Sequence, residues 1–115
     1  MHWTSEFYTK RAGEPRELLW LLPMLWCAMY DSLGARGILS VAATANTNIN
    51  VDQRGDMPTT CTSDYLISVT STSIQDQRNL SSAFGPISID LGAPGEGVLT
   101  TFVGNSYGSA SGTSF

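Results

Sequence analysis

The end of the chain carries a hydroxyl group in a setting that could support nucleophilic chemistry. Ser114 closes the tripeptide Gly112-Thr113-Ser114. A serine attacks a carbonyl only when a base takes its proton, and the oxyanion that forms needs hydrogen-bond donors. By itself the tripeptide is a weak signal, because Gly-Thr-Ser usually forms a turn and such a serine can simply cap a helix. The surrounding elements must therefore decide between a nucleophile and a cap.

The composition indicates a globular protein. The chain has 115 residues, of which 42% are apolar and 14% charged, whereas disordered chains are usually poorer in apolar residues. This length suits one small domain or part of a larger one. A net charge of −4 argues against a nucleic-acid partner, which requires a basic patch.

The hydrophobic pattern predicts an α/β fold with a mainly parallel sheet. We expect a helix over residues 24–33, with Pro23 near its start, where a missing N–H costs little, and Gly34 as its stop. The β-branched run after it predicts a strand that is buried on both faces. The predicted strands span residues 37–45, 65–70, 87–91 and 98–102, a polar loop covers 46–64, and a Gly- and Ser-rich approach leads to the C-terminus.

The predicted sheet is incomplete. Parallel strands need crossover connections, usually helices, yet the pattern offers one convincing helix, and residues 1–23 stay unassigned as a possibly aberrant N-terminal segment. We therefore expect a truncated domain over residues 24–115. The alternative is a gene fragment that folds poorly, because open strand edges favour aggregation.

The apolar run at residues 18–30 is the one candidate targeting segment. It is shorter than the ~20 residues that span a bilayer, so no membrane partner is expected. It could form the core of a signal peptide, but Glu6, Glu14 and Glu17 stand where such a leader is basic. The pattern favours a buried helix.

Two cysteines, Cys27 and Cys61, are too few for a disulfide framework. One bridge between them is an open alternative. The pattern favours a free buried thiol on the helix and a second free thiol in the loop.

The order of four segments resembles the subtilisin-like serine peptidases (subtilases, peptidase family S8). These segments are GILSVAATAN, YLISVTST, SIDLGAPGEGVLTT and NSYGSASGTSF, and the resemblance extends over about residues 24–115. In that family an Ala-Pro-Gly turn, here Ala93-Pro94-Gly95, precedes the Gly-Thr-Ser that carries the nucleophile. The resemblance implies a partial three-layer subtilisin-like fold, serine endopeptidase activity on polypeptides, and secretion.

The resemblance also implies roles for individual residues. Ser114 matches the nucleophile at the start of a helix, approached through a flexible Gly112, and Asn46 matches the asparagine whose amide N–H binds the oxyanion. A strand-end asparagine bound to its own loop is the alternative for Asn46. The residues matching the walls of the primary specificity pocket are Ala43, Thr44, Ala45, Pro58 and Thr59, of which the last two could equally form an ordinary turn.

The other two members of the catalytic triad have no match. The single histidine, His2, lacks the family's glycine context, and Asp31 falls inside the predicted helix. Without an imidazole base and its carboxylate, a serine is an ordinary alcohol. We therefore expect this chain alone to be inactive, with missing parts of its own catalytic domain as its partner. No cofactor is expected, and no carboxylate cluster suggests the calcium sites common in the family.

Two further motifs suggest a different class of function or a modification. Arg54-Gly55-Asp56 is a cell-adhesion tripeptide in a hydrophilic loop, so a non-catalytic binding module is the alternative function. Asn79-Leu80-Ser81 is a formal glycosylation acceptor, although a plain turn accounts for it equally simply.

Overall fold

The computed structural model describes residues 16–115, and their side chains from residue 21 onward. Two helices and five strands follow one another in the order α1 (Arg16–Gly34), β1 (Ser40–Ala43), α2 (Val51–Arg54), β2 (Leu66–Thr72), β3 (Leu91–Pro94), β4 (Val98–Phe102) and β5 (Ser106–Ala110). This content confirms the predicted α/β class.

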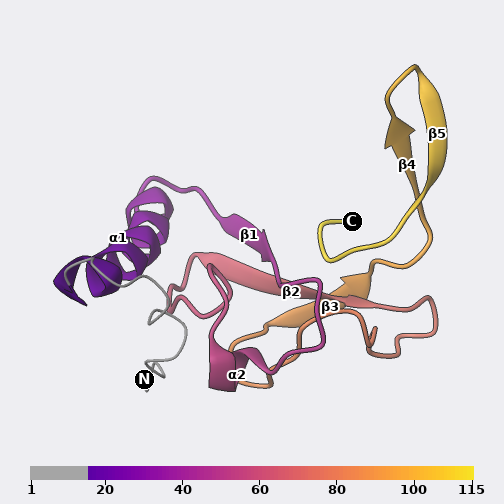
Figure 1. The fold of residues 1–115 in the computed structure, drawn as a ribbon. Helices are drawn as coiled ribbons and strands as arrows, with labels where there is room; N and C mark the ends of the chain where they lie inside the picture. Colours follow the sequence, from indigo (N-terminus) through magenta and orange to yellow (C-terminus); the bar gives the residue numbers. More distant parts are fainter. Residues whose placement is uncertain (1–15) are drawn as a thin grey trace.

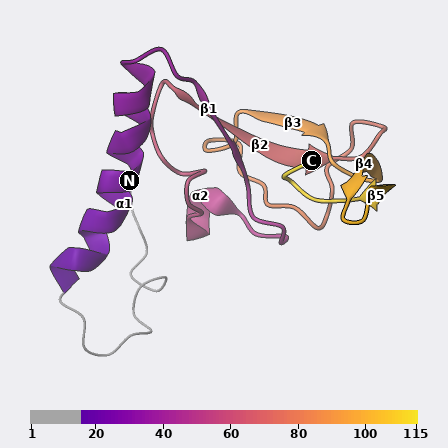
Figure 2. The ribbon, with the colours of Figure 1, turned by 90° about the horizontal axis from the view of Figure 1, so that it is seen from above.

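The three strands β1, β2 and β3 form a parallel sheet in that order. The other two, β4 and β5, form an antiparallel hairpin that projects from the sheet, while α1 lies at the opposite end of the molecule (Figure 1). Figure 2 shows the same separation from above. The sheet is thus mainly parallel, as predicted.

Both helices depart from the predicted boundaries. α1 begins at Arg16 rather than residue 24, so Pro23 lies inside it and not at its start. The proline removes one backbone donor, but the leucine-rich sequence around it continues the helix. The predicted polar loop contains the short helix α2, where Asn50 accepts a hydrogen bond from Asp52 N–H as an N-cap. Val51 in this helix is completely buried.

The third strand lies later than predicted. Residues 86–88 form a turn, and β3 begins at Leu91. The N–H groups of Ile87 and Ser88 donate to the carboxylate of Asp52 at 3.1 and 2.9 Å. Because a side chain satisfies these donors, the segment does not need a strand partner.

The second strand of the hairpin is absent from the sequence prediction, which expected a loop there. Gly104 and Asn105 take positive φ angles of 78° and 57° at the turn, which these two residue types tolerate best. The turn lets Tyr107 and Ser109 pair with Thr101 and Leu99. Small polar residues therefore form a strand because a partner stands opposite them.

The interior is small and largely polar. Among the described residues the buried apolar side chains are those of Val51, Leu66 and Ala83, while buried polar ones include Thr44, Thr59, Ser68, Ser71 and Ser82. Val41 in β1 is 68% exposed, so the prediction that this strand is buried on both faces is wrong. The described part of the chain leaves most of this residue uncovered.

The helix α1 is fastened to the loop before β2 along one line of contacts, called here the helix seam. Cys27 and Cys61 form a disulfide with Cα atoms 5.2 Å apart, so the expectation of two free thiols is wrong. One helical turn further, Ser63 Oγ donates to Asp31 Oδ1 at 2.6 Å. At the end of α1, Gly34 lies directly on the ring of Tyr65. Positions 27, 31 and 34 lie on one face of the helix, and positions 61, 63 and 65 lie on one face of the extended chain opposite it. The three contacts therefore form one continuous seam.

Candidate active site

The structure brings Asn46 and the Gly-Thr-Ser segment together. Asn46 Oδ1 accepts hydrogen bonds from Thr113 N at 2.9 Å and from Thr113 Oγ1 at 3.1 Å. These residues are 67 positions apart in the chain. The contact therefore depends on the fold, and it places the amide of Asn46 next to the residue that precedes Ser114.

The hydrogen bonds also orient the Asn46 side chain. Both bonds use its carbonyl oxygen, so its amide NH₂ group, on the other side of Cγ, is turned away from Thr113. Asn46 is solvent-exposed. An exposed amide donor held by its own oxygen has the character required of an oxyanion donor.

Thr113 is the residue that joins the segment to the sheet. It is buried, and its single hydroxyl hydrogen is shared between Asn46 Oδ1 and Thr44 O, directly after β1, which is the nearer acceptor at 2.5 Å. The sequence motif gave Thr113 no role beyond its place in Gly-Thr-Ser. Nothing in its residue type indicated that its side chain would bind both Thr44 and Asn46.

Two chain segments approach each other closely at Gly95, where only glycine leaves enough room, whereas Gly112 has room for a Cβ atom. A Cβ atom at Gly95 would lie 2.5 Å from Gly112 O and 2.6 Å from Ser71 Oγ, whereas one at Gly112 would make ordinary contacts of 3.5 Å. Gly112 is not among the positive-φ residues. The prediction that this position requires the backbone freedom of glycine is therefore wrong. The Ala-Pro-Gly motif ends in the glycine that lets the two segments pack, and Gly112 N donates to Gly95 O at 2.8 Å.

Ser114 lies in a turn with Thr113 and is exposed. Residues 113 and 114 form a turn, so within the described residues the expected helix does not begin at Ser114. Its hydroxyl is accessible from solvent, as a nucleophile must be. The donor assigned to the helix end is therefore the Ser114 N–H alone.

The five residues predicted to line a specificity pocket occupy two neighbouring stretches. Thr44 is buried, and its hydroxyl bonds to Thr70 Oγ1 at 3.3 Å, so its side chain turns toward β2. Ala43 and Ala45 are half-buried. Pro58 follows Met57 through a cis peptide bond, and Thr59 is 1% exposed. Substrate contact by these residues stays a prediction.

Asp56 connects these two stretches, a role that the sequence did not indicate. Its Oδ2 atom accepts from Ala45 N at 2.9 Å and from Thr59 Oγ1 at 2.8 Å. The adhesion hypothesis predicted an exposed Arg-Gly-Asp loop. Arg54 is exposed, but Asp56 is half-buried and its carboxylate is engaged within the protein, which speaks against capture by an adhesion receptor.

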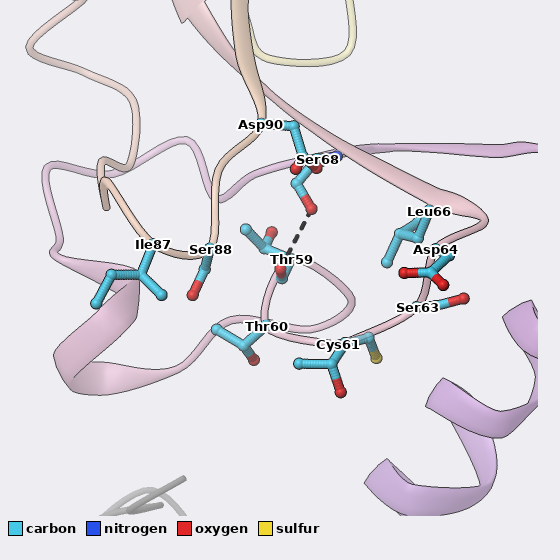
Figure 3. A pocket seen from close by; sticks show the side chains of 11 residues that line it. Thr59, Thr60, Cys61, Ser63, Asp64, Leu66, Ser68, Ile87, Ser88 and Asp90 are labelled. Carbon is cyan, nitrogen blue, oxygen red and sulfur yellow. Dashed lines mark hydrogen bonds between the residues drawn. The ribbon is translucent and has the colours of Figure 1, made fainter.

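A half-open pocket of about 320 Å³ lies beside the second stretch, next to the helix seam (Figure 3). Its walls come from residues 59–64, from Leu66 and Ser68 at the start of β2, and from Ile87, Ser88 and Asp90. Ser68 Oγ donates to Thr59 O at 3.2 Å across it. Neither Asn46 nor Ser114 lines this pocket, so the pocket is separate from the candidate nucleophile. Thr59 lines the pocket and is also one of the five residues predicted to contact substrate.

The other candidates from the sequence have structural explanations or lie outside the described residues. His2 is outside them. Asp31 belongs to the helix seam. Asn79 is 9% exposed and its amide nitrogen donates to Ser71 Oγ, so the folded chain does not offer it for glycosylation.

Residues 16–115 contain no group of three or more His, Cys, Asp or Glu side chains placed to hold a metal ion. Within the same range, no helix has both the length and the apolar character to cross a bilayer.

The chain belongs to the subtilase family, because the model of that family (the S8 peptidases) matches residues 3–115. By family it is thus a serine peptidase, a hydrolase of polypeptides. The match includes almost all of the segment 1–23, to which the sequence patterns assigned no structure. No curated protein matches this chain.

Proposed function

We propose that this chain contributes the nucleophile and the oxyanion donor of a serine endopeptidase that acts through an acyl-enzyme. Ser114 Oγ would attack the peptide carbonyl, and the Asn46 amide and the Ser114 N–H would stabilise the oxyanion. The carrying observation is the pair of hydrogen bonds from Thr113 to Asn46 Oδ1, at 2.9 and 3.1 Å. They hold a side-chain amide beside the serine segment with its NH₂ group free of that contact.

The proton of Ser114 must go to a base that the described residues do not supply. They contain no histidine, since His2 is the only one in the chain. We infer that the 115 residues alone hydrolyse no peptide bonds. The active unit would include further polypeptide of a subtilase catalytic domain that carries the imidazole and its carboxylate.

An extracellular location is part of the proposal. The Cys27–Cys61 disulfide supports it, because such bonds persist in oxidising compartments and are rare in the cytosol. A protein isolated from its native source with both thiols free would contradict this part.

The test uses a serine-directed fluorophosphonate probe on the full chain. We expect no labelling of the chain alone. After co-refolding with a subtilase segment that carries the Asp and His motifs, we expect labelling that Ser114→Ala abolishes. Asn46→Ala should lower the labelling rate by about 10²–10³-fold, the effect of removing one oxyanion donor.

The matched control is Asn48→Ala. Asn48 is also exposed, and its Oδ1 accepts from Arg78 at 3.1 Å, away from the serine segment. Equal effects of the two asparagine substitutions, or labelling that survives Ser114→Ala, would refute the proposed roles.

A further inference from the structure

We propose that Asp56 is a positioning residue, which holds the Asn46 amide in place and ties together the two stretches that flank it. The inference rests on the proposed function for its catalytic meaning. It begins from the single carboxylate oxygen, Oδ2, that accepts from both Ala45 N and Thr59 Oγ1.

The Ala45 N–H needs this acceptor because the sheet provides none. Thr44 N donates to Val69 O in β2, and successive N–H groups of an extended chain point to opposite sides. The Ala45 N–H therefore points away from β2, toward the open edge of β1. Asp56 satisfies it there with an ionised acceptor, which forms a stronger bond than a neutral one.

The bond lies directly before Asn46 in the chain. Ala45 O accepts from Ala83 N at 2.9 Å, so Ala45 is held from both sides of its backbone. With Ala45 held, Asn46 can move only through rotation about its own backbone and side-chain bonds. The hydrogen bonds from Thr113 restrain the side chain. Asp56 thus fixes one end of the residue whose amide faces the reaction, and Thr113 the other.

Asp56 is itself anchored. Its carbonyl oxygen accepts from both Thr60 N and Thr60 Oγ1, each at 2.9 Å, so the turn over residues 56–60 presents the carboxylate in a fixed direction. The second bond of Oδ2 goes to Thr59, which is buried. One carboxylate therefore sets the spacing between residue 45 and residue 59.

The test measures amide hydrogen exchange and ¹⁵N–¹H spectra of the full chain. For Asp56→Ala we expect the Ala45 amide to exchange about 10–100-fold faster, the range for losing a hydrogen bond to a charged group. The side-chain NH₂ signals of Asn46 and the Thr113 amide signal should shift with it. Asp56→Asn keeps the shape and one neutral acceptor, so its effects should lie between those of wild type and Asp56→Ala.

Asp52 provides the matched control, because its carboxylate also accepts two backbone N–H bonds, from Ile87 and Ser88. Asp52→Ala should destabilise the fold similarly but leave the Asn46 signals unchanged. Equal shifts of the Asn46 signals in Asp56→Ala and Asp52→Ala would show a merely structural role and overturn the proposal. Asn46 signals that stay unshifted in both Asp56→Ala and Asp56→Asn would overturn it too.

These signals do not depend on catalysis, so failure of the labelling experiment and failure of the Asp56 assignment are separate outcomes. If Asp56→Ala does not fold, the comparison of Asp56→Asn with Asp52→Asn decides in the same way.

Discussion

The molecule fastens its two ends to the sheet in different ways. The helix seam joins α1 to the loop before β2 through a covalent bond and two side-chain contacts. At the other end, residues 111–113, called here the serine strap, are held by hydrogen bonds from backbone and side-chain groups. Gly112 N donates to Gly95 O, and Thr113 donates to Thr44 O and to Asn46 Oδ1.

The difference reflects what each attachment must determine. The seam needs only to keep an exposed helix near the sheet, and a disulfide does so without a large apolar interface. Under the proposed function the strap places a serine relative to an amide, which requires directional hydrogen bonds of fixed length. The following substitutions separate the two attachments, and they are ordered from the largest expected effect to the smallest.

Cutting the seam should cost most. In the double variant Cys27→Ser, Cys61→Ser the unfolded chain regains the freedom of a 34-residue loop, which the chain-entropy model values at about 4 kcal/mol. Urea denaturation should show this loss in the free energy of unfolding. The Thr113 and Asn46 NMR signals should stay in place, because the hydrogen bonds of the strap go to Gly95, Gly97, Thr44 and Asn46 and to no seam residue. Loss of those signals at native conditions would show that the two attachments are coupled.

Overpacking the strap should cost less. In Gly95→Ala the new Cβ meets Gly112 O and Ser71 Oγ at 2.5 and 2.6 Å. Backbone must move, at a cost of about 1–3 kcal/mol, which urea denaturation measures. The control is Gly112→Ala, where the nearest atoms are 3.5 Å away. A larger loss for Gly112→Ala than for Gly95→Ala would contradict the packing described for the strap.

Removing one hydroxyl should have the smallest effect. Thr113→Val keeps the shape but leaves Thr44 O without the hydrogen of Thr113. An unsatisfied buried acceptor costs about 1–2 kcal/mol, again read from the free energy of unfolding. Thr101→Val on the exposed face of β4 should change it by less than about 0.5 kcal/mol. The two variants behaving alike would mean that the Thr113 hydroxyl does not hold the strap.

The sequence predicted the helices and strands whose own residue types favour that structure without a particular partner. The segments around β1, β2 and β4 were found from their β-branched residues, and α1 from its apolar run. The missed or displaced elements depend on partners. β5 is small and polar but pairs with β4. Ile87 and Ser88 leave the sheet because Asp52 satisfies their N–H groups. α2 is one turn stabilised by its cap and the burial of Val51.

The candidate site divides in the same way. Ser114 and Asn46 could be named as candidates because their motifs are local. Asp56 and Thr113 were not, because their importance comes from contacts 11 and 67–69 residues away. The cysteine pair was misjudged for the same reason, since two thiols 34 positions apart give no sign of their distance in space.

The amino-acid sequence by itself determined the family and the α/β class, and it singled out the serine and the asparagine as candidates. These follow from short motifs and from the alternation of apolar and polar residues, which are properties of neighbouring positions. Only the tertiary structure decided which groups meet: the disulfide partner of Cys27, the glycine at the close approach, and the carboxylate that holds residue 45. Those contacts join segments distant in sequence, and their geometry exists only after the chain has packed.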